Sequence, residues 1–133
     1  MYMLDTNICI YIIKKKSENV LRKLKEHRGK GLYISTITLA ELEFGNANAN
    51  SLYKERNQLA LLEFLTIMGI KFFDERAAKE YGIIRKNLKD RNCIIGSFDM
   101  LIGAHAKSLD MTLVTNNVSE FERIHDLKIE NWV

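Results

Sequence analysis

The sequence contains no proline, only two cysteines, and no apolar run near the roughly 18 residues that a membrane-spanning helix requires. The missing run argues against a membrane protein. No basic segment precedes an apolar one at the N-terminus, which argues against a secretory signal. Cys9 and Cys93 are far apart in the chain and are expected to be reduced thiols, with a disulfide as the less favoured alternative. We therefore expect a cytoplasmic protein that has no contact with a membrane.

Charge is unevenly distributed along the chain. The formal net charge is +3, but residues 14–30 hold eight basic residues against two acidic ones and so carry a local charge of +6. Beside an acidic site, a basic stretch of this kind favours a polyanionic partner such as a nucleic acid. The simpler interpretation is a helix with a solvated charged face, and a run of charge by itself favours that interpretation.

The spacing of apolar residues predicts one α/β domain that spans residues 1–133. A length of 133 residues with 47% apolar residues suits one packed core. The patterns predict strands at 2–5, 32–34, 70–73, 112–115 and 128–130, and helices at 7–14, 17–28, 36–44, 51–67, 75–91 and from 97 onward. Gly45 is predicted to end the third helix and Ser97 to cap the last one. Strands that alternate with helices form a mostly parallel sheet sandwiched between helices.

Four acidic residues stand where strands end or helices begin, namely Asp5, Glu41, Asp99 and Glu120. Asp5 ends the first apolar run, and ligands of open α/β folds bind at the carboxyl edge of the sheet. Each acid also has a structural explanation. Asp5 could cap the next helix, and Glu41 could form a capping box with Thr38. Asp99 could interact with a helix dipole, and Glu120 could be an ordinary surface acid. Their shared position favours a common site.

Several carboxylates in one site require a counter-charge. Two carboxylates about 5 Å apart repel by roughly 3 kcal/mol at an effective dielectric constant of about 20. Without a cation, a cluster of four would take up protons or destabilise the fold. Oxygen ligands favour Mg²⁺ or Mn²⁺ over zinc, and such ions can activate water for hydrolysis of a phosphodiester. His105 lies on the apolar face of its helix and is predicted to be packed there, not to bind a metal.

Four segments of the sequence, taken in order, resemble the PIN-domain ribonucleases, and in particular the VapC toxins of bacterial toxin–antitoxin pairs. The segments are Met3-Leu4-Asp5-Thr6-Asn7, residues 35–42 with Gly45, residues 98–106, and Val114-Thr115-Asn116-Asn117 with Glu120-Phe121. The resemblance covers essentially the whole chain. It implies a parallel sheet sandwiched by helices, with four acids meeting at its carboxyl edge.

The resemblance also implies roles for individual residues. Asp5, Glu41 and Asp99 match the first three acids of the family. Many relatives carry an aspartate where this chain has Asn117, so Glu120 is expected to take the fourth acidic position. The implied metal ligands are Asp5, Asp99 and Glu120, with Glu41 assisting in catalysis. Four further residues match positions that orient the acids, namely Thr6, Asn7, Thr115 and Asn117.

The implied activity is that of an endoribonuclease dependent on Mg²⁺ or Mn²⁺, which cuts structured RNA such as tRNA and so slows translation. The implied partners are a small antitoxin whose tail covers the acidic pocket, and a second copy of the chain in a homodimer. Three alternatives remain open at this point. They are a housekeeping PIN ribonuclease that trims ribosomal RNA, a non-catalytic module of the same fold, and a phospho-acceptor receiver domain with Asp74 at the end of its third strand.

Overall fold

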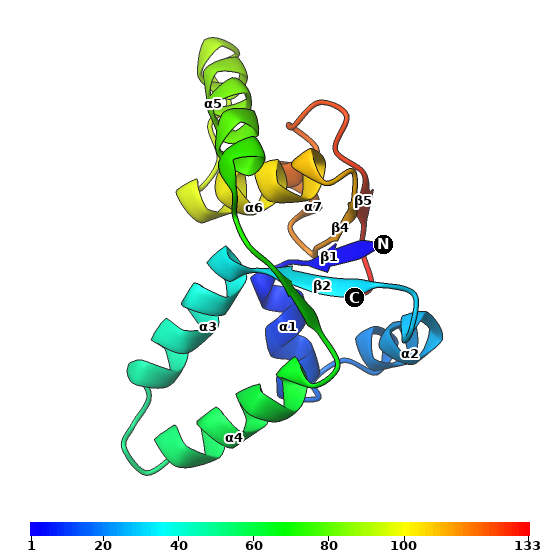
Figure 1. Ribbon diagram of the computed structural model, residues 1–133, viewed down its shortest axis with the longest axis vertical. Coiled ribbons are helices and arrows are strands. Elements are labelled where there is room, and N and C mark those ends of the chain that lie inside the picture. The colour runs from blue at the N-terminus through cyan, green and yellow to red at the C-terminus, as the bar shows by residue number, and fades with distance from the viewer.

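A sheet of five parallel strands forms the centre of the protein, in a computed structural model that describes residues 1–133 (Figure 1). The strand order across the sheet is β3-β2-β1-β4-β5. The strands are short, and their bounds are β1 Tyr2–Leu4, β2 Leu32–Ser35, β3 Gly69–Lys71, β4 Thr112–Val114 and β5 Ile129–Glu130. All four pairings between neighbouring strands are parallel, as the alternation of strands and helices predicted.

Seven helices cover the two faces of this sheet. The helices are α1 Thr6–Ile13, α2 Glu18–His27, α3 Thr36–Ala47, α4 Lys54–Leu65, α5 Glu75–Asp90, α6 Ser97–Ser108 and α7 Val118–Phe121. Helices α1 to α4 lie on one face and α5 to α7 on the other, so the sheet is sandwiched between two helical layers (Figure 1). The predicted α/β sandwich is therefore confirmed.

Alternation of side chains along the strands divides the core into two parts. In β1, Met3 packs in the core beneath α5 to α7, whereas Leu4 packs in the core beneath α1 to α4. Leu113 and Val114 of β4 divide in the same way. Successive side chains of a strand point to opposite faces, and both faces of a parallel sheet are normally covered. This burial on both sides fixes the carboxyl ends of β1 and β4, from which the site is built.

Several helix boundaries differ from the prediction. Helix α3 continues through Gly45 and ends at Ala47, and helix α4 begins at Lys54, after the predicted residue 51. A glycine inside a helix costs only about 1 kcal/mol relative to alanine, so the packing of the rest of α3 can carry the helix past it. At the start of α6, Gly96 and not Ser97 is the N-cap residue. A side chain at position 96 would come into contact with a carboxylate oxygen of Asp99, because its Cβ would lie 3.4 Å away.

The sheet has a topological switch point between β1 and β4, where the order of successive strands changes direction. Strands β2 and β3 are added on one side of β1, and β4 and β5 on the other. In open α/β sheets, the crevice outside the carboxyl ends of the strands at such a point is where ligands bind. Asp5 directly follows β1 and Thr115 directly follows β4, so the first predicted acid lies at this position. No helix of the chain combines the length and the apolar character needed to cross a membrane.

Candidate active site

Asp5 is held at the switch point by hydrogen bonds to both of its carboxylate oxygens. Its Oδ1 accepts the backbone N–H of Thr6 at 2.8 Å, and its Oδ2 accepts the hydroxyl of Thr115 at 2.8 Å. Its backbone N–H donates to the carbonyl of Val114 at 2.9 Å, which joins β1 to β4 at this point. Asp5 is 3% exposed and is also the N-cap residue of α1. The capping explanation is therefore correct, and it coexists with a place in the acidic site.

Burial dominates the electrostatics of Asp5. Removal from water raises the pKa of its carboxyl, because the charged form loses hydration. Hydrogen bonds from Thr115 and Thr6 lower the pKa, and the negative charge of Glu41 raises it. The net shift is upward. No basic side chain is among these causes, so the carboxylate is stabilised by neutral donors only, and a cation would be attracted to it.

Glu41 reaches the same edge of the sheet from α3. Its Oε1 accepts the hydroxyl of Thr6 at 2.6 Å, and that hydroxyl lies 3.2 Å from the hydroxyl of Thr38. The capping box of Thr38 with Glu41 is not formed, since Ser35 is the N-cap residue of α3 and Thr38 is buried inside the helix. Glu43, two residues further along α3, is exposed and takes no part in the hydrogen bonds that join the clustered acids.

Asp99 and Glu120 are joined by one amide group. Asn117 donates from Nδ2 to Oδ2 of Asp99 at 3.2 Å and to Oε2 of Glu120 at 2.9 Å. Asp99 comes from the first turn of α6 and Glu120 from α7, so this amide connects two helices. The backbone N–H of Asn117 donates to the Thr115 hydroxyl at 2.9 Å, which continues the network to Asp5.

The pKa values of this pair shift in opposite directions. The pKa of Asp99 rises to about 7, first because of burial, then because of its hydrogen bond with Glu120 and the negative charges of Asp5, Glu120 and Glu41. The pKa of Glu120 is lowered, first by the hydrogen bond from Asn117. Asp99 is therefore the acid that retains a proton near neutral pH. The other three predicted acids all raise the pKa of this one carboxyl group, so the four lie near one another at the edge of the sheet.

The cluster suits a hard divalent cation, although it does not form a finished cage. No group of three or more His, Cys, Asp or Glu side chains converges on one point. Mg²⁺ is usually held by one or two carboxylates and completes its coordination with water. Asp5 and Asp99 each retain free acceptor capacity, because a carboxylate offers about four lone-pair sites and their hydrogen bonds occupy only some of them. These two acids, with Glu120 beside them, are the side chains that could hold such an ion.

The supporting residues divide into two groups. Thr6, Thr115 and Asn117 hydrogen-bond directly to the acids. Asn7 is exposed and makes no side-chain hydrogen bond to an acid, so its orienting role stays a prediction.

A buried contact that the sequence analysis did not anticipate joins α6 to the start of α3. Nδ1 of His105 lies 2.8 Å from the hydroxyl of Ser35, and both residues are buried. The prediction that His105 is packed in the core is confirmed. The hydroxyl of Ser35 also accepts the N–H of Ile37, so the contact fixes the first turn of the helix that carries Glu41. The only sequence signal for the contact between His105 and Ser35 is a serine at the end of a strand, directly before a helix.

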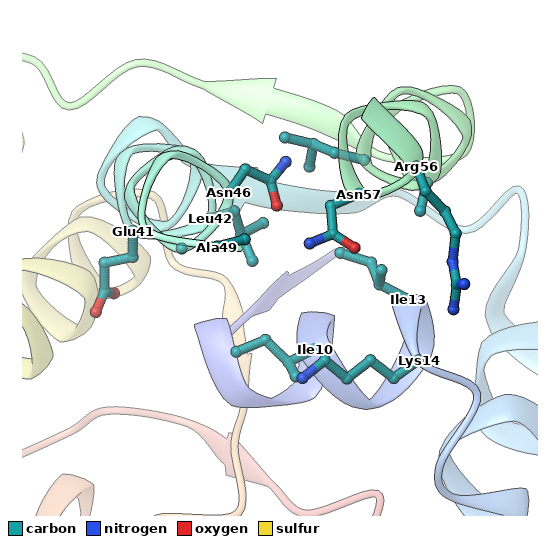
Figure 2. Close-up of a pocket in the computed structure, with 12 residues that line it drawn as sticks. Ile10, Ile13, Lys14, Glu41, Leu42, Asn46, Ala49, Arg56 and Asn57 are labelled. Atoms are coloured by element: carbon teal, nitrogen blue, oxygen red, sulfur yellow. The ribbon is translucent and has the colours of Figure 1, made fainter. Parts of the chain in front are cut away.

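A pocket of about 600 Å³ opens between α1, α3 and α4, with Glu41 at one end (Figure 2). Figure 2 shows Glu41 pointing away from the middle of the pocket and Arg56 extending from α4 at the other side. Lys14, at the end of α1, supplies a second positive charge. Half of the lining is apolar, contributed by Ile10, Ile13, Leu42, Ala49, Ala60 and Leu61. The acidic edge thus continues into a groove with an apolar floor and two basic groups.

The basic stretch at residues 14–30 does not flank the acidic cluster. Helix α1 begins at the cluster and carries the chain about 12 Å away over its eight residues. Helix α2 then leads to the amino end of β2, on the other side of the molecule from the start of α3 (Figure 1). Arg22 pairs with Glu26 at 3.0 Å on the exposed face of α2. Apart from Lys14, the basic stretch lies away from the acidic cluster, which agrees with the favoured interpretation of a solvated helix face.

Comparison with known proteins agrees with this geometry. A family model for the PIN domain matches residues 2–127. Ribonuclease VapC2 of Haemophilus influenzae is 40% identical over 132 residues, which cover 99% of this chain and 98% of that protein. The tRNA(fMet)-specific endonuclease VapC of Shigella flexneri is 39% identical over 131 residues, which cover 98% of this chain and 97% of that protein.

The fold leads to the same family. A chain in the crystal structure of VapBC2 from Rickettsia felis, bound to a DNA fragment from their promoter, superposes with a TM-score of 0.93 and 41% identity, covering 99% of this chain and 98% of that one. The receiver-domain alternative is excluded, and Asp74 acts instead as the N-cap of α5, accepting the N–H of Ala77 at 3.1 Å. The chain therefore belongs to the PIN-domain family and, within it, to the VapC ribonucleases of VapBC toxin–antitoxin systems.

Proposed function

We propose that this protein is a Mg²⁺- or Mn²⁺-dependent endoribonuclease toxin that hydrolyses phosphodiester bonds in structured RNA. The observation that carries the proposal is the connected network at the switch point, in which neutral donors hold Asp5, Glu41, Asp99 and Glu120 together. A network of this kind keeps acids close together that would otherwise repel one another. None of the four acids forms a salt bridge, although the positive charge of Arg123 helps to lower the pKa of Glu120, and such a cluster of carboxylates favours binding of a divalent cation.

The residues of the site would have separate roles in binding the cation and in positioning its ligands. Asp5, Asp99 and Glu120 would hold the cation, which supplies an activated water and stabilises the leaving oxygen of the phosphodiester. The hydroxyl of Thr115 and the N–H of Thr6 each donate to one carboxylate oxygen of Asp5 and so fix its position. The hydroxyl of Thr6 fixes the carboxylate of Glu41, which is placed to orient water or to accept a proton.

A structured RNA such as tRNA is the proposed substrate, and inhibition of translation the proposed consequence. Support comes from the Shigella flexneri relative, which is named a tRNA(fMet)-specific endonuclease. The proposed compartment is the cytoplasm, where such RNA is found.

We propose two protein partners. The first is a small antitoxin whose tail enters the pocket beside Glu41 and covers the acidic cluster. The apolar floor of that pocket suits apolar side chains of such a tail, and the Rickettsia felis relative was solved as VapBC2. The second is another copy of the chain. Ile70 and Phe72, at the exposed edge strand β3, are 37% and 77% exposed and offer an apolar surface for a homodimer.

RNA cleavage by the purified protein tests the proposal. Total tRNA is incubated with wild type and with Asp5→Asn, in Mn²⁺ and in chelator, and the new ends are mapped. Asp5→Asn keeps the shape and the Oδ1 acceptor but removes the charge, so we expect a loss of cleavage of at least 100-fold. Equal cleavage by the two proteins, or cleavage that is unaffected by chelator, would refute the proposed chemistry. No cleavage of tRNA, together with specific cleavage of ribosomal RNA, would favour a processing enzyme.

A further inference from the structure

Asn117 lies at the start of α7 but does not use its side chain to cap that helix. Its backbone occupies the N-cap position, and its side chain makes no capping hydrogen bond. Asparagine is among the residues that most often cap a helix with the side chain. Here the amide is instead directed at two acids, with Nδ2 donating to Asp99 at 3.2 Å and to Glu120 at 2.9 Å. Its position therefore reflects the acidic cluster and not the helix.

The NH₂ end of the amide faces the acids, because both acceptors are carboxylates. An NH₂ group donates hydrogen bonds and cannot ligate a cation. It holds one oxygen of Asp99 and one of Glu120 within about 6 Å of each other without adding charge. An aspartate of the same shape would instead repel both carboxylates and would itself be able to bind a cation.

The backbone of Asn117 keeps the side chain in place. Its N–H donates to the hydroxyl of Thr115 at 2.9 Å, and that hydroxyl donates to Asp5 at 2.8 Å. This part of the network does not involve the Asn117 side chain. A substitution at position 117 would therefore change the clamp on Asp99 and Glu120 while the support of Asp5 remains.

We propose that Asn117 sets the number of metal ions in the site, by clamping Asp99 and Glu120 with a neutral amide and limiting the protein to one tightly bound divalent cation. The inference rests on the proposed function, because it takes these acids as the ligands. Two ions in one site lie about 3.5–4 Å apart, and their mutual repulsion has to be offset by additional anionic ligands. The side chain of Asn117 lies within hydrogen-bond distance of both Asp99 and Glu120, where an anionic side chain could supply such a ligand, and it presents a neutral donor instead.

Mn²⁺ binding by the full-length, RNA-free protein tests this inference. Stoichiometry and affinity are measured by calorimetry and by electron paramagnetic resonance, which counts free and bound Mn²⁺ without any RNA cleavage. We expect one tight ion on wild type and two on Asn117→Asp. Asn117→Ala should bind one ion about 10- to 100-fold more weakly, as is typical when a residue that orients metal ligands is removed.

The neighbouring asparagine provides a matched control. Asn116 is exposed, and its Oδ1 accepts a hydrogen bond from Asn131 at 3.3 Å, away from the acids. Asn116→Asp adds the same charge one residue away and should bind Mn²⁺ as wild type does. If Asn117→Asp gains affinity and Asn116→Asp does not, the effect belongs to the clamp and not to net charge.

Several results would overturn the inference. They are two equally tight ions on wild type, the same stoichiometry in wild type and Asn117→Asp, or unchanged affinity in Asn117→Ala. Circular dichroism shows whether Asn117→Asp is folded. If it is not, the Mn²⁺ affinity of Asn117→Ala tests the inference instead. A wild type that binds no Mn²⁺ overturns both this inference and the metal dependence. A wild type that binds one ion but cleaves no RNA refutes only the proposed function.

Discussion

Replacing Asp99 by asparagine should stabilise the metal-free protein while removing its response to metal. The pKa of Asp99 rises from 3.8 to about 7, which corresponds to about 4 kcal/mol of unfavourable free energy when the group is ionised. Because this carboxyl is only half buried, solvent screening reduces that figure, and we expect about 1–2 kcal/mol in practice. Asparagine keeps an oxygen that can accept the hydrogen bond from Asn117. We therefore expect Asp99→Asn to raise the free energy of unfolding at pH 8.

The advantage of Asp99→Asn depends on both pH and metal. A carboxyl whose folded pKa is raised destabilises the fold only above its unfolded pKa, so the penalty is absent below about 3.8, grows up to about pH 7 and is then constant. The advantage of Asp99→Asn should therefore be larger at pH 8 than at pH 5. In Mn²⁺ at ten times the Kd, wild type should gain about 1.4 kcal/mol from binding, and the variant should gain almost none.

Thermal unfolding measures both effects. In chelator at pH 8 the Tm of Asp99→Asn should exceed that of wild type by about 5 °C, since 1 kcal/mol corresponds to about 3–5 °C for a domain of this size. Glu43→Gln is the control, because Glu43 is an exposed acid on α3 that takes no part in the hydrogen bonds joining the clustered carboxylates. It should leave the Tm and the Mn²⁺ response unchanged. A variant Asp99→Asn that is less stable than wild type in chelator, or that keeps the full Mn²⁺ response, would show that the reasoning is wrong.

Three further predictions concern the network of acids and the pocket beside it. Thr115→Val keeps the shape of the side chain but removes the donor to buried Asp5, so chemical denaturation should show a loss of about 1–3 kcal/mol, and RNA cleavage should fall with it. The affinity for Mn²⁺ should rise about tenfold per pH unit up to about pH 7 and then level off, because Asp99 has to lose its proton to bind a cation; calorimetry at several pH values checks this, and a flat profile contradicts it. Ile13→Glu places a charge on the apolar floor of the pocket and should abolish co-purification with the antitoxin while RNA cleavage is retained; loss of both would mean that the pocket is not a separate partner surface.

The positions of the acids along the strands and helices could be read from the sequence, because they depend on local patterns. Asp5 ends an apolar run, and a buried run that ends at an acid predicts a strand with a carboxylate at its edge. The contacts that join the acids could not be read in this way. Thr115 and Asp5 are 110 residues apart in the chain, and they meet only because β4 lies next to β1 in the sheet. Strand order is a property of the whole fold, so the sequence predicted the members of the site but not their connections.

Tertiary structure outweighs two local signals in the sequence. Gly45 was predicted to end α3, and the basic residues 14–30 were considered as a contact for a polyanion beside the acids, although a solvated helix face was the favoured interpretation. The cost of one glycine in a helix is small beside the burial of Leu42 and the packing of α3 on α4 and α6. Helix α1 likewise separates the basic stretch from Asp5, although the two are close in sequence.

The capping and catalytic explanations of Asp5 were presented as alternatives, and the structure makes them compatible. Capping uses one acceptor position on Oδ1, and the bond from Thr115 uses one on Oδ2. A carboxylate has about four acceptor positions, so roughly half of them remain for a cation. The cap also supplies what a ligand of a metal site needs, because a carboxylate fixed by two donors loses little conformational freedom when a cation binds. An acid that ends a strand at the switch point and caps the next helix is thus held in place locally and still has free acceptor positions. This explains how four acids can share one sheet edge before any metal is bound: each of them receives a hydrogen bond from Thr6, Thr115 or Asn117, and these neutral donors offset part of the repulsion.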